Sequence, residues 1–128
     1  MKRVRITIEY IFRASPAILY QFLTTPACLV RWFCDEVDIN GTIYTFSWSG
    51  MDEDAELVDD VEEELLRFRW IDADNPNEYF EFRIQESPVT GETVLELTDF
   101  CDAVEEKDIR RYWDTQIQKL QKETGGVG

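Results

Sequence analysis

The sequence predicts an α+β domain in which one curved antiparallel sheet wraps around a long C-terminal helix. Three features lead to this prediction: apolar and polar residues alternate in seven segments, two short helix starts follow the first segment, and one amphipathic stretch ends the chain. Alternation with a period of two is typical of strands that bury one face. Only the last helix is long enough to cover that face, so the expected order is one strand, two short helices, six strands and one helix (β-α-α-β6-α).

The first strand and the two short helices carry the clearest local signals. The segment Arg5–Arg13 places four large side chains on one face of a strand, namely Ile6, Ile8, Tyr10 and Phe12. Ser15-Pro16 and Thr25-Pro26 each place a capping hydroxyl before a proline at the first helical position. These two caps predict helices over Ser15–Leu23 and Pro26–Trp32.

A hairpin and four further strands are expected next. Asn40-Gly41 lies inside the β-rich segment Glu36–Trp48, and this dipeptide favours a type I′ turn, in which both central residues have positive φ. The later strands are read from the segments AELVDDV, LLRFRWI, EYFEFRIQ and TVLELTDFC. Turn-forming residues separate them at 62–64, 72–77 and 87–91.

The last helix is expected over roughly Ala103–Lys122. Asp102 and Glu105 have the spacing of a capping box, and the pair Gly125-Gly126 ends the helical pattern. Its apolar stripe recurs at intervals of four and three and comprises Ile109, Trp113, Ile117 and Leu120. We expect one domain over residues 1–124 and a flexible tail over residues 125–128.

Composition excludes several classes of function. The 128 residues include 13 basic and 27 acidic side chains, which give a net charge of −14. Binding to nucleic acid is therefore not expected, because phosphate contacts need a basic face. There is no histidine, so imidazole bases, Ser-His-Asp triads and HExxH zinc sites are excluded. No catalytic residue, metal ligand or cofactor is assigned.

The expected location is the cytoplasm. The start of the chain carries Glu9 inside a very short apolar run, which does not fit a signal peptide, and no later segment is long and apolar enough for a membrane span. Cys28, Cys34 and Cys101 are odd in number and lack CxxC spacing, which favours buried reduced thiols.

The candidate binding residues are large side chains that strand alternation and helix periodicity place between the sheet and the last helix. A small-molecule site there would use residues from both, namely Trp32, Phe46, Trp48, Phe68, Trp70, Phe82, Leu97, Asp99, Tyr112 and Trp113. A solid core explains any single aromatic residue of this set equally well, because small domains need the apolar area that such side chains bury.

Two aspartates are candidates for inward-facing acids. Asp99 follows Leu95 and Leu97 on one face, so alternation points its carboxylate towards the opening of the pocket, where desolvation would raise its pKa. The alternatives are an aspartate turned to solvent or one that helps to cap the last helix. Asp59 lies between Leu57 and Val61 on one face, and a bulge or an edge position explains it equally well.

The middle of the chain is strongly acidic. No Lys or Arg lies between Asp35 and Glu64. This predicts an anionic sheet edge, which either keeps the protein in solution or docks a basic protein partner. The segment DADNPNE begins like a calcium loop, but Pro76 stands at the fifth position and the required glycine does not follow.

These segments together resemble a known family. The segment FRASPAILYQFLTTPACLVRWF, the Asn-Gly hairpin, AELVDDVEEELLRFRW, ETVLELTD and the Trp-bearing last helix are similar to the START-like, or helix-grip, superfamily, which includes birch-pollen-allergen-like proteins. The nearest branch resembles homologues of the activator of heat-shock protein 90 ATPase. Many relatives in that branch have a histidine at the end of the strand before the last helix, where this chain has Asp99.

The resemblance implies a hydrophobic cavity between the long helix and the sheet. The first hypothesis is therefore a binding module for a small hydrophobic molecule or lipid. The second is a chaperone-activator-like interaction domain that uses its acidic surface. An enzyme that uses Asp99 is a third hypothesis, and the missing histidine weakens it.

Overall fold

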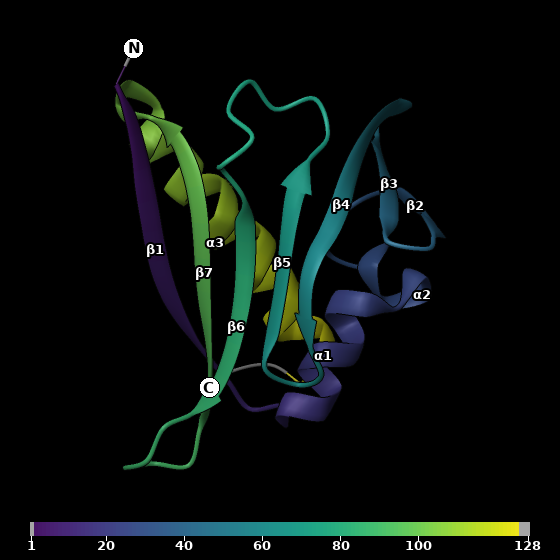
Figure 1. Ribbon diagram of the computed structural model, residues 1–128. Helices are drawn as coiled ribbons and strands as arrows, with labels where there is room; N and C mark the ends of the chain where they lie inside the picture. The colour runs from purple at the N-terminus through teal and green to yellow at the C-terminus, as the bar shows by residue number, and fades with distance from the viewer. Residues whose placement is uncertain (1, 126–128) are drawn as a thin grey trace.

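Seven antiparallel strands form one sheet, and all helices lie on one of its faces (Figure 1). The computed structural model describes residues 2–125. The strands lie in the order β1-β7-β6-β5-β4-β3-β2. The elements are β1 Arg3–Phe12, α1 Pro16–Thr24, α2 Pro26–Leu29, β2 Glu36–Asn40, β3 Ile43–Trp48, β4 Met51–Val61, β5 Leu65–Trp70, β6 Phe80–Glu86, β7 Thr93–Asp102, the 3-10 helix η1 Ala103–Glu105 and α3 Glu106–Glu123. The predicted α+β class, strand count and element order are confirmed.

Helix α3 packs its apolar stripe on the concave face of the sheet. Trp113, Ile117 and Leu120 are buried, as the sequence periodicity predicts, and Ile109 packs at the margin of the core. Side-chain hydrogen bonds fix the helix on several sides. Tyr10 Oη donates to Asp114 at 2.7 Å, and Gln116 Nε2 donates to the carbonyl of Trp32 at 2.8 Å. The helix is thus tied both to β1 and to the segment that follows α2.

The second short helix is shorter than predicted. α2 ends at Leu29, and residues 30–33 form turns instead of continuing the helix to Trp32. The indole of Trp32 donates to the carbonyl of Phe22 at 2.9 Å, which holds the chain against α1. The turn brings Trp32 and Phe33 into the core, where both are nearly fully buried. A continued helix would have pointed them to different sides.

Of the three predicted helix caps, one forms. Ser15 Oγ accepts from the backbone N–H of Ile18 at 3.3 Å. Thr25 makes no such bond, although Pro26 begins α2 as predicted. The predicted capping box at Asp102 is wrong, because this carboxylate accepts from the Arg3 guanidinium at 3.0 Å, and the helix begins with the η1 turn.

The β2–β3 hairpin has the predicted position but not the predicted turn. Asn40 pairs with Ile43, so Gly41 and Thr42 are the two central residues. Gly41 has a φ of +64°, and neither Asn40 nor Thr42 has positive φ. The type I′ turn centred on Asn40-Gly41 is therefore wrong. One positive φ at the first central position is the pattern of a type II′ turn, for which glycine is suited.

A bulge in β4 decides which aspartate faces inward. The register against β5 shifts between Leu57 and Asp59, and Asp59 is exposed. The inward placement considered for Asp59 is therefore wrong, and the alternative of a bulge is correct. Asp60 lies on the inward side instead, in register with the buried Leu66, and although it is exposed it accepts from Tyr20 Oη at 2.5 Å.

The convex face carries an ionic cluster rather than a covering helix. Glu81 is only 4% exposed although alternation places it on the solvent side. Arg67 Nε donates to it at 2.7 Å, and the same guanidinium lies over the ring of Tyr79, 4.1 Å from the ring centroid. Simple alternation cannot predict this, because the neighbouring side chains cover Glu81.

Two further expectations concern the ends of the chain and the membrane. The tail predicted at residues 125–128 lies, apart from Gly125, outside the described residues. No helix within residues 2–125 is long and apolar enough to cross a membrane.

Replacing Trp113 tests the packing of α3. We expect Trp113→Ala to lower the free energy of unfolding by about 3–5 kcal/mol, because it removes a buried indole that contacts both the core and Asp99. Urea denaturation followed by circular dichroism measures the loss. The matched control is Tyr112→Ala, whose side chain is 42% exposed and should lose less than about 1 kcal/mol. Equal losses for the two variants would contradict this packing.

Candidate functional site

Aromatic rings fill the space between α3 and the middle of the sheet. Phe33 lies at the centre of this cluster, although it belongs to neither the sheet nor α3. Its ring centroid lies 4.8–6.3 Å from five other rings, which belong to Phe46, Trp32, Trp48, Trp113 and Phe80. Edge-to-face and stacked pairs at these distances add to the energy of burial.

The candidate residues from the sequence fall into two groups. Six are buried in the aromatic cluster or directly beside it, namely Trp32, Phe46, Phe68, Phe82, Leu97 and Trp113. Four lie at its margin, where part of each side chain reaches the surface, namely Trp48, Trp70, Asp99 and Tyr112. The accessible part of the predicted site is therefore the margin.

A notch in the sheet forms the larger opening at this margin. β4 continues to Met51 and β7 to Asp102, whereas β5 ends at Trp70 and β6 begins only at Phe80. The connection over residues 71–79 bridges this gap at the top of Figure 1, beside the start of β1. The two short inner strands thus leave a space bounded by two long ones.

This notch is a cleft of about 650 Å³. Its aromatic lining consists of Trp70, Tyr79 and Phe100, and its acidic lining of Glu53, Asp54, Asp72, Asp74, Glu78, Asp99 and Asp102. Ala73, Asn75 and Arg3 complete the lining. The volume is within the range of about 300–1,000 Å³ that is usual for small-molecule sites.

Trp70 connects the cleft to the aromatic cluster. Its ring lies 4.9 Å from Phe80, 6.1 Å from Phe46 and 6.2 Å from Trp48, measured between centroids. The side chain is half-buried, so one part packs in the cluster and another lines the cleft. A molecule in the cleft would therefore touch the apolar interior at Trp70.

Asp99 faces inward, as strand alternation predicts, and connects β7 to α3. Its Oδ2 accepts from Trp113 Nε1 at 2.9 Å, and its Oδ1 accepts from the backbone N–H of Phe100 at 2.8 Å. Desolvation raises the pKa of Asp99, and the two hydrogen bonds partly oppose this because they favour the charged form. The predicted direction of the shift is the one found. Neither alternative for Asp99 applies, because it neither turns to solvent nor caps α3.

A second, smaller cavity lies between the segment that follows α2 and the outer side of α3. Its volume is about 210 Å³, and it includes the three predicted residues Trp32, Trp48 and Tyr112. Cys34 also lines it, and burial raises the pKa of this thiol to about 11. Cys34 is therefore protonated at neutral pH, which does not favour a nucleophilic role.

The sequence did not identify the central ring or the outer wall of the cleft. Phe33 was missed because the expected end of α2 at Trp32 left it outside a regular element. Alternation places Glu78 and Tyr79 in the strand EYFEFRIQ, whereas β6 begins at Phe80. The sequence does not predict that Arg3 lines the cleft, since its partners Glu78 and Asp102 are distant along the chain.

The polar groups of the cleft are mainly carboxylates, and they form no cluster of metal ligands in the described part of the chain. Within residues 2–125, no group of three or more Cys, Asp or Glu side chains is arranged to hold a metal ion. Asp99 has both oxygens engaged by N–H donors. What the cleft offers a ligand is aromatic surface and negative charge.

The titration of Asp99 tests the geometry of the site. We expect its pKa to lie above the ordinary value of about 3.9 and to rise further in Trp113→Phe, which removes a donor that favours the carboxylate. Carboxyl resonances followed by NMR through acid pH measure both values. Because the folded-state pKa exceeds the unfolded one, ionised Asp99 costs stability at neutral pH, and this cost shrinks as the pH falls below the folded-state pKa and is gone below the unfolded-state pKa.

The matched control for this titration is Trp48→Phe. The indole of Trp48 donates to the carbonyl of Phe33 at 2.7 Å, not to Asp99. The pKa of Asp99 should be the same in this variant as in the unchanged protein. A fall of the pKa in Trp113→Phe would show that the indole does not stabilise the carboxylate.

Comparison with known proteins identifies the family. The family model of the START-like superfamily domain matches residues 1–126. The solution structure of BfR322 from Bacteroides fragilis is 35% identical, covers 100% of this chain and 96% of its own, and superposes with a TM-score of 0.70. A search of curated proteins found no match.

Two more distant structures share the fold. The Aha1 dimer from Colwellia psychrerythraea is 17% identical, covers 98% of this chain and 99% of its own, and has a TM-score of 0.82. CalU16 from Micromonospora echinospora is 20% identical, covers 97% of this chain and 76% of its own, and has a TM-score of 0.72. With the family match over nearly its whole length, this chain belongs to the START-like superfamily.

Proposed function

We propose that this protein binds a small hydrophobic molecule or lipid at the open end of the space between α3 and the sheet. START-like domains are generally ligand-binding, which agrees with the hypothesis drawn from the sequence. The cleft beside Trp70 is the place for the exposed part of that ligand. The observation that carries the proposal is that the same Trp70 side chain both packs in the aromatic cluster and lines the cleft.

The packing of the interior supports a site at this margin. Phe33 already contacts the rings in the middle of the concave face, so a ligand reaching deeper would have to displace it. Displacing a well-packed aromatic side chain costs several kcal/mol, whereas the cleft offers apolar contact without that cost.

A neutral apolar probe tests this proposal. We expect N-phenylnaphthylamine to bind the folded protein with a Kd of about 0.1 mM or lower and to gain fluorescence as it leaves water. Trp70→Ala should weaken this binding about tenfold or more, because it removes the ring that lines the cleft. Fluorescence titration measures both Kd values.

Trp48→Ala is the matched control for this titration. Trp48 is also a half-buried member of the aromatic cluster, but it lines the smaller cavity and not the cleft. Its replacement should leave probe binding nearly unchanged. Loss of binding in Trp48→Ala alone would place the ligand at the smaller cavity. No binding to the unchanged protein would overturn the proposal.

A chaperone-activator-like interaction domain is the second candidate, because carboxylates of β2 and β4 lie on the outer face of the sheet, on either side of β3. Glu36 lies in register with Ser47 and Asp52, and Asp38 with Thr45 and Asp54. The acidic strip, as we name it, consists of Glu36, Asp38, Asp52, Asp54 and Glu56. Among the described residues, only Glu56 of this strip has a cationic partner, Arg69 at 3.0 Å.

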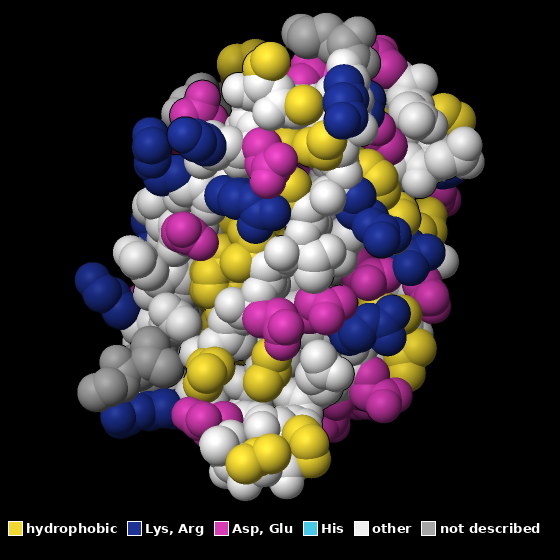
Figure 2. Space-filling view, turned by 90° about the vertical axis from the view of Figure 1, so that its left-hand side faces the viewer, with side chains coloured by type: hydrophobic (Ala, Val, Ile, Leu, Met, Phe, Trp, Pro, Cys, Tyr) yellow, Lys and Arg dark blue, Asp and Glu magenta, His cyan; other side chains and the backbone are white. Residues whose placement is uncertain are grey.

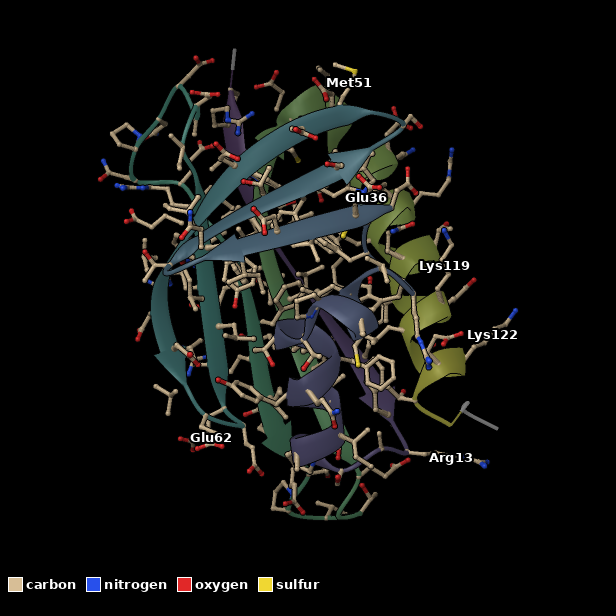
Figure 3. The ribbon with its side chains drawn as sticks, turned by 90° about the vertical axis from the view of Figure 1, so that its right-hand side faces the viewer. Arg13, Glu36, Met51, Glu62, Lys119 and Lys122 are labelled. Carbon is tan, nitrogen blue, oxygen red and sulfur yellow. The ribbon has the colours of Figure 1, made fainter. Side chains whose placement is uncertain are left out.

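The charge of this strip contrasts with the opposite edge of the sheet. On the face shown in Figure 2, Lys and Arg side chains are interspersed with Asp and Glu. Figure 3 shows the β2–β4 end, with Glu36 and Met51 near its edge. Such segregation favours a basic partner on the acidic side. The fold shared with the Aha1 dimer agrees with this second candidate.

The ATPase rate of a purified heat-shock protein 90 tests the second candidate. If it applies, adding this protein should raise the rate, and replacing Glu36 and Asp38 together by Lys should abolish the effect by cancelling most of the negative charge of the strip. Replacing Glu62 and Glu86 by Lys is the control, because these exposed acids lie outside the strip. An unchanged ATPase rate with the unmodified protein would exclude this activity.

A further inference from the structure

We propose that the cleft selects organic cations, meaning small molecules that carry an amine or other positively charged group on an apolar or aromatic body. This inference rests on the proposed function, because it assumes that the cleft binds a ligand, and it adds the sign of that ligand's charge. The cleft combines two independent features that favour such a molecule, namely an uncompensated negative charge and an aromatic wall.

The negative charge of the cleft is balanced only in part. Of the seven carboxylates that line it, Glu78 and Asp102 bind the Arg3 guanidinium. The other five have no ion pair with any described residue. Arg3 is also the one cationic side chain in the described lining. A carboxylate or phosphate ligand would therefore be repelled, and a cation attracted.

Asp99 contributes charge at the inner wall of the cleft. Both donors to its carboxylate, the Trp113 indole and the Phe100 backbone, are uncharged groups. They orient the carboxylate without neutralising it. Glu53 faces the same side of the sheet from β4, because it pairs with the inward residue Phe46. Carboxylates on β4 and β7 thus border the cleft on two sides.

The aromatic wall gives the ligand's body a surface and its charge a further partner. One ring of this wall, Tyr79, already has the Arg67 guanidinium 4.1 Å from its centroid, so Trp70 is the main ring left for the charge of a ligand. Trp70 is the half-buried indole of the cleft, and indole is the strongest aromatic partner for cations in proteins. The same ring can contact an apolar body.

Three probes with the same ring system but different charge test this inference: naphthylmethylamine, naphthylmethanol and naphthoate. Calorimetric titration at about 0.01 M salt should show the amine binding at least about tenfold more tightly than the alcohol, and naphthoate binding weakest. The preference for the amine should shrink towards about 1 M salt, because the screening length falls from about 30 Å to about 3 Å.

Two triple variants locate the effect. Glu53→Gln with Asp72→Asn and Asp74→Asn neutralises exposed acids of the cleft and should remove most of the preference for the amine. Glu62→Gln with Glu86→Gln and Glu92→Gln changes the net charge equally at exposed positions outside the cleft lining and should preserve the preference. Figure 3 shows Glu62 and Met51 at opposite ends of β4, which separates Glu62 from the cleft residue Glu53.

Each outcome decides one of the two proposals. Equal binding of amine and alcohol, both weakened by Trp70→Ala, would overturn the inference and leave the proposed function standing. A preference for the amine that both triple variants reduce equally would also overturn the inference, because it would reflect the overall charge of −14. If none of the three probes and no neutral probe binds, the proposed function itself fails.

Discussion

Burial of the apolar stripe of α3 on the concave face is the constraint on which the rest of this fold depends. The sheet has one covered face, and α3 shares its cover with α1, α2 and the turn that follows α2 (Figure 1). A single helix is narrower than seven strands, so the remaining aromatic surface must be covered in another way. The turn after α2 meets this need by inserting Trp32 and Phe33 between the helix and the sheet. Large rings therefore fill the concave face.

This way of filling the core decides where a ligand can bind. A packed interior leaves accessible aromatic surface only at the margin, where β5 and β6 are shorter than β4 and β7. The cleft forms there because the 71–79 connection spans the gap without filling it. Polar and charged side chains line such an edge, since they remain in contact with water. The position of the site is thus a consequence of unequal strand lengths.

The distribution of charge follows from the same architecture. Strand alternation turns the carboxylates of β2 and β4 to the outer face, where no helix covers them. The inward-facing positions at the start of β4 lie beyond the packed core, so acidic residues are tolerated there as well. Part of the acidic excess therefore lies in an acidic strip on the outer face and part in an acidic cleft at the edge, with Asp54 common to both. Arg3 is the exception, and it connects the two margins of the cleft by binding Glu78 and Asp102.

The sequence by itself determined the elements and their faces. The period of two placed Phe46, Phe68 and Leu97 inward, the Ser15-Pro16 pair marked the start of α1, and alternation along β7 turned Asp99 towards α3. These features are local, because they depend on residues a few positions apart, and local patterns are what periodicity and capping describe.

Only the tertiary structure decided the features that depend on distant neighbours. The bulge between Leu57 and Asp59 placed Asp60 instead of Asp59 on the inward face of β4. Arg67 covered Glu81 and so buried a residue of the outer face. Arg3 competed for the Asp102 carboxylate that would have capped the last helix. Phe33 reached the centre of the core because the chain turned at Leu29, and the space it fills is created by the sheet and α3 together. No pattern within one segment records which segment will lie opposite it, so the packed interior and the cleft at its edge emerged only once the chain was folded.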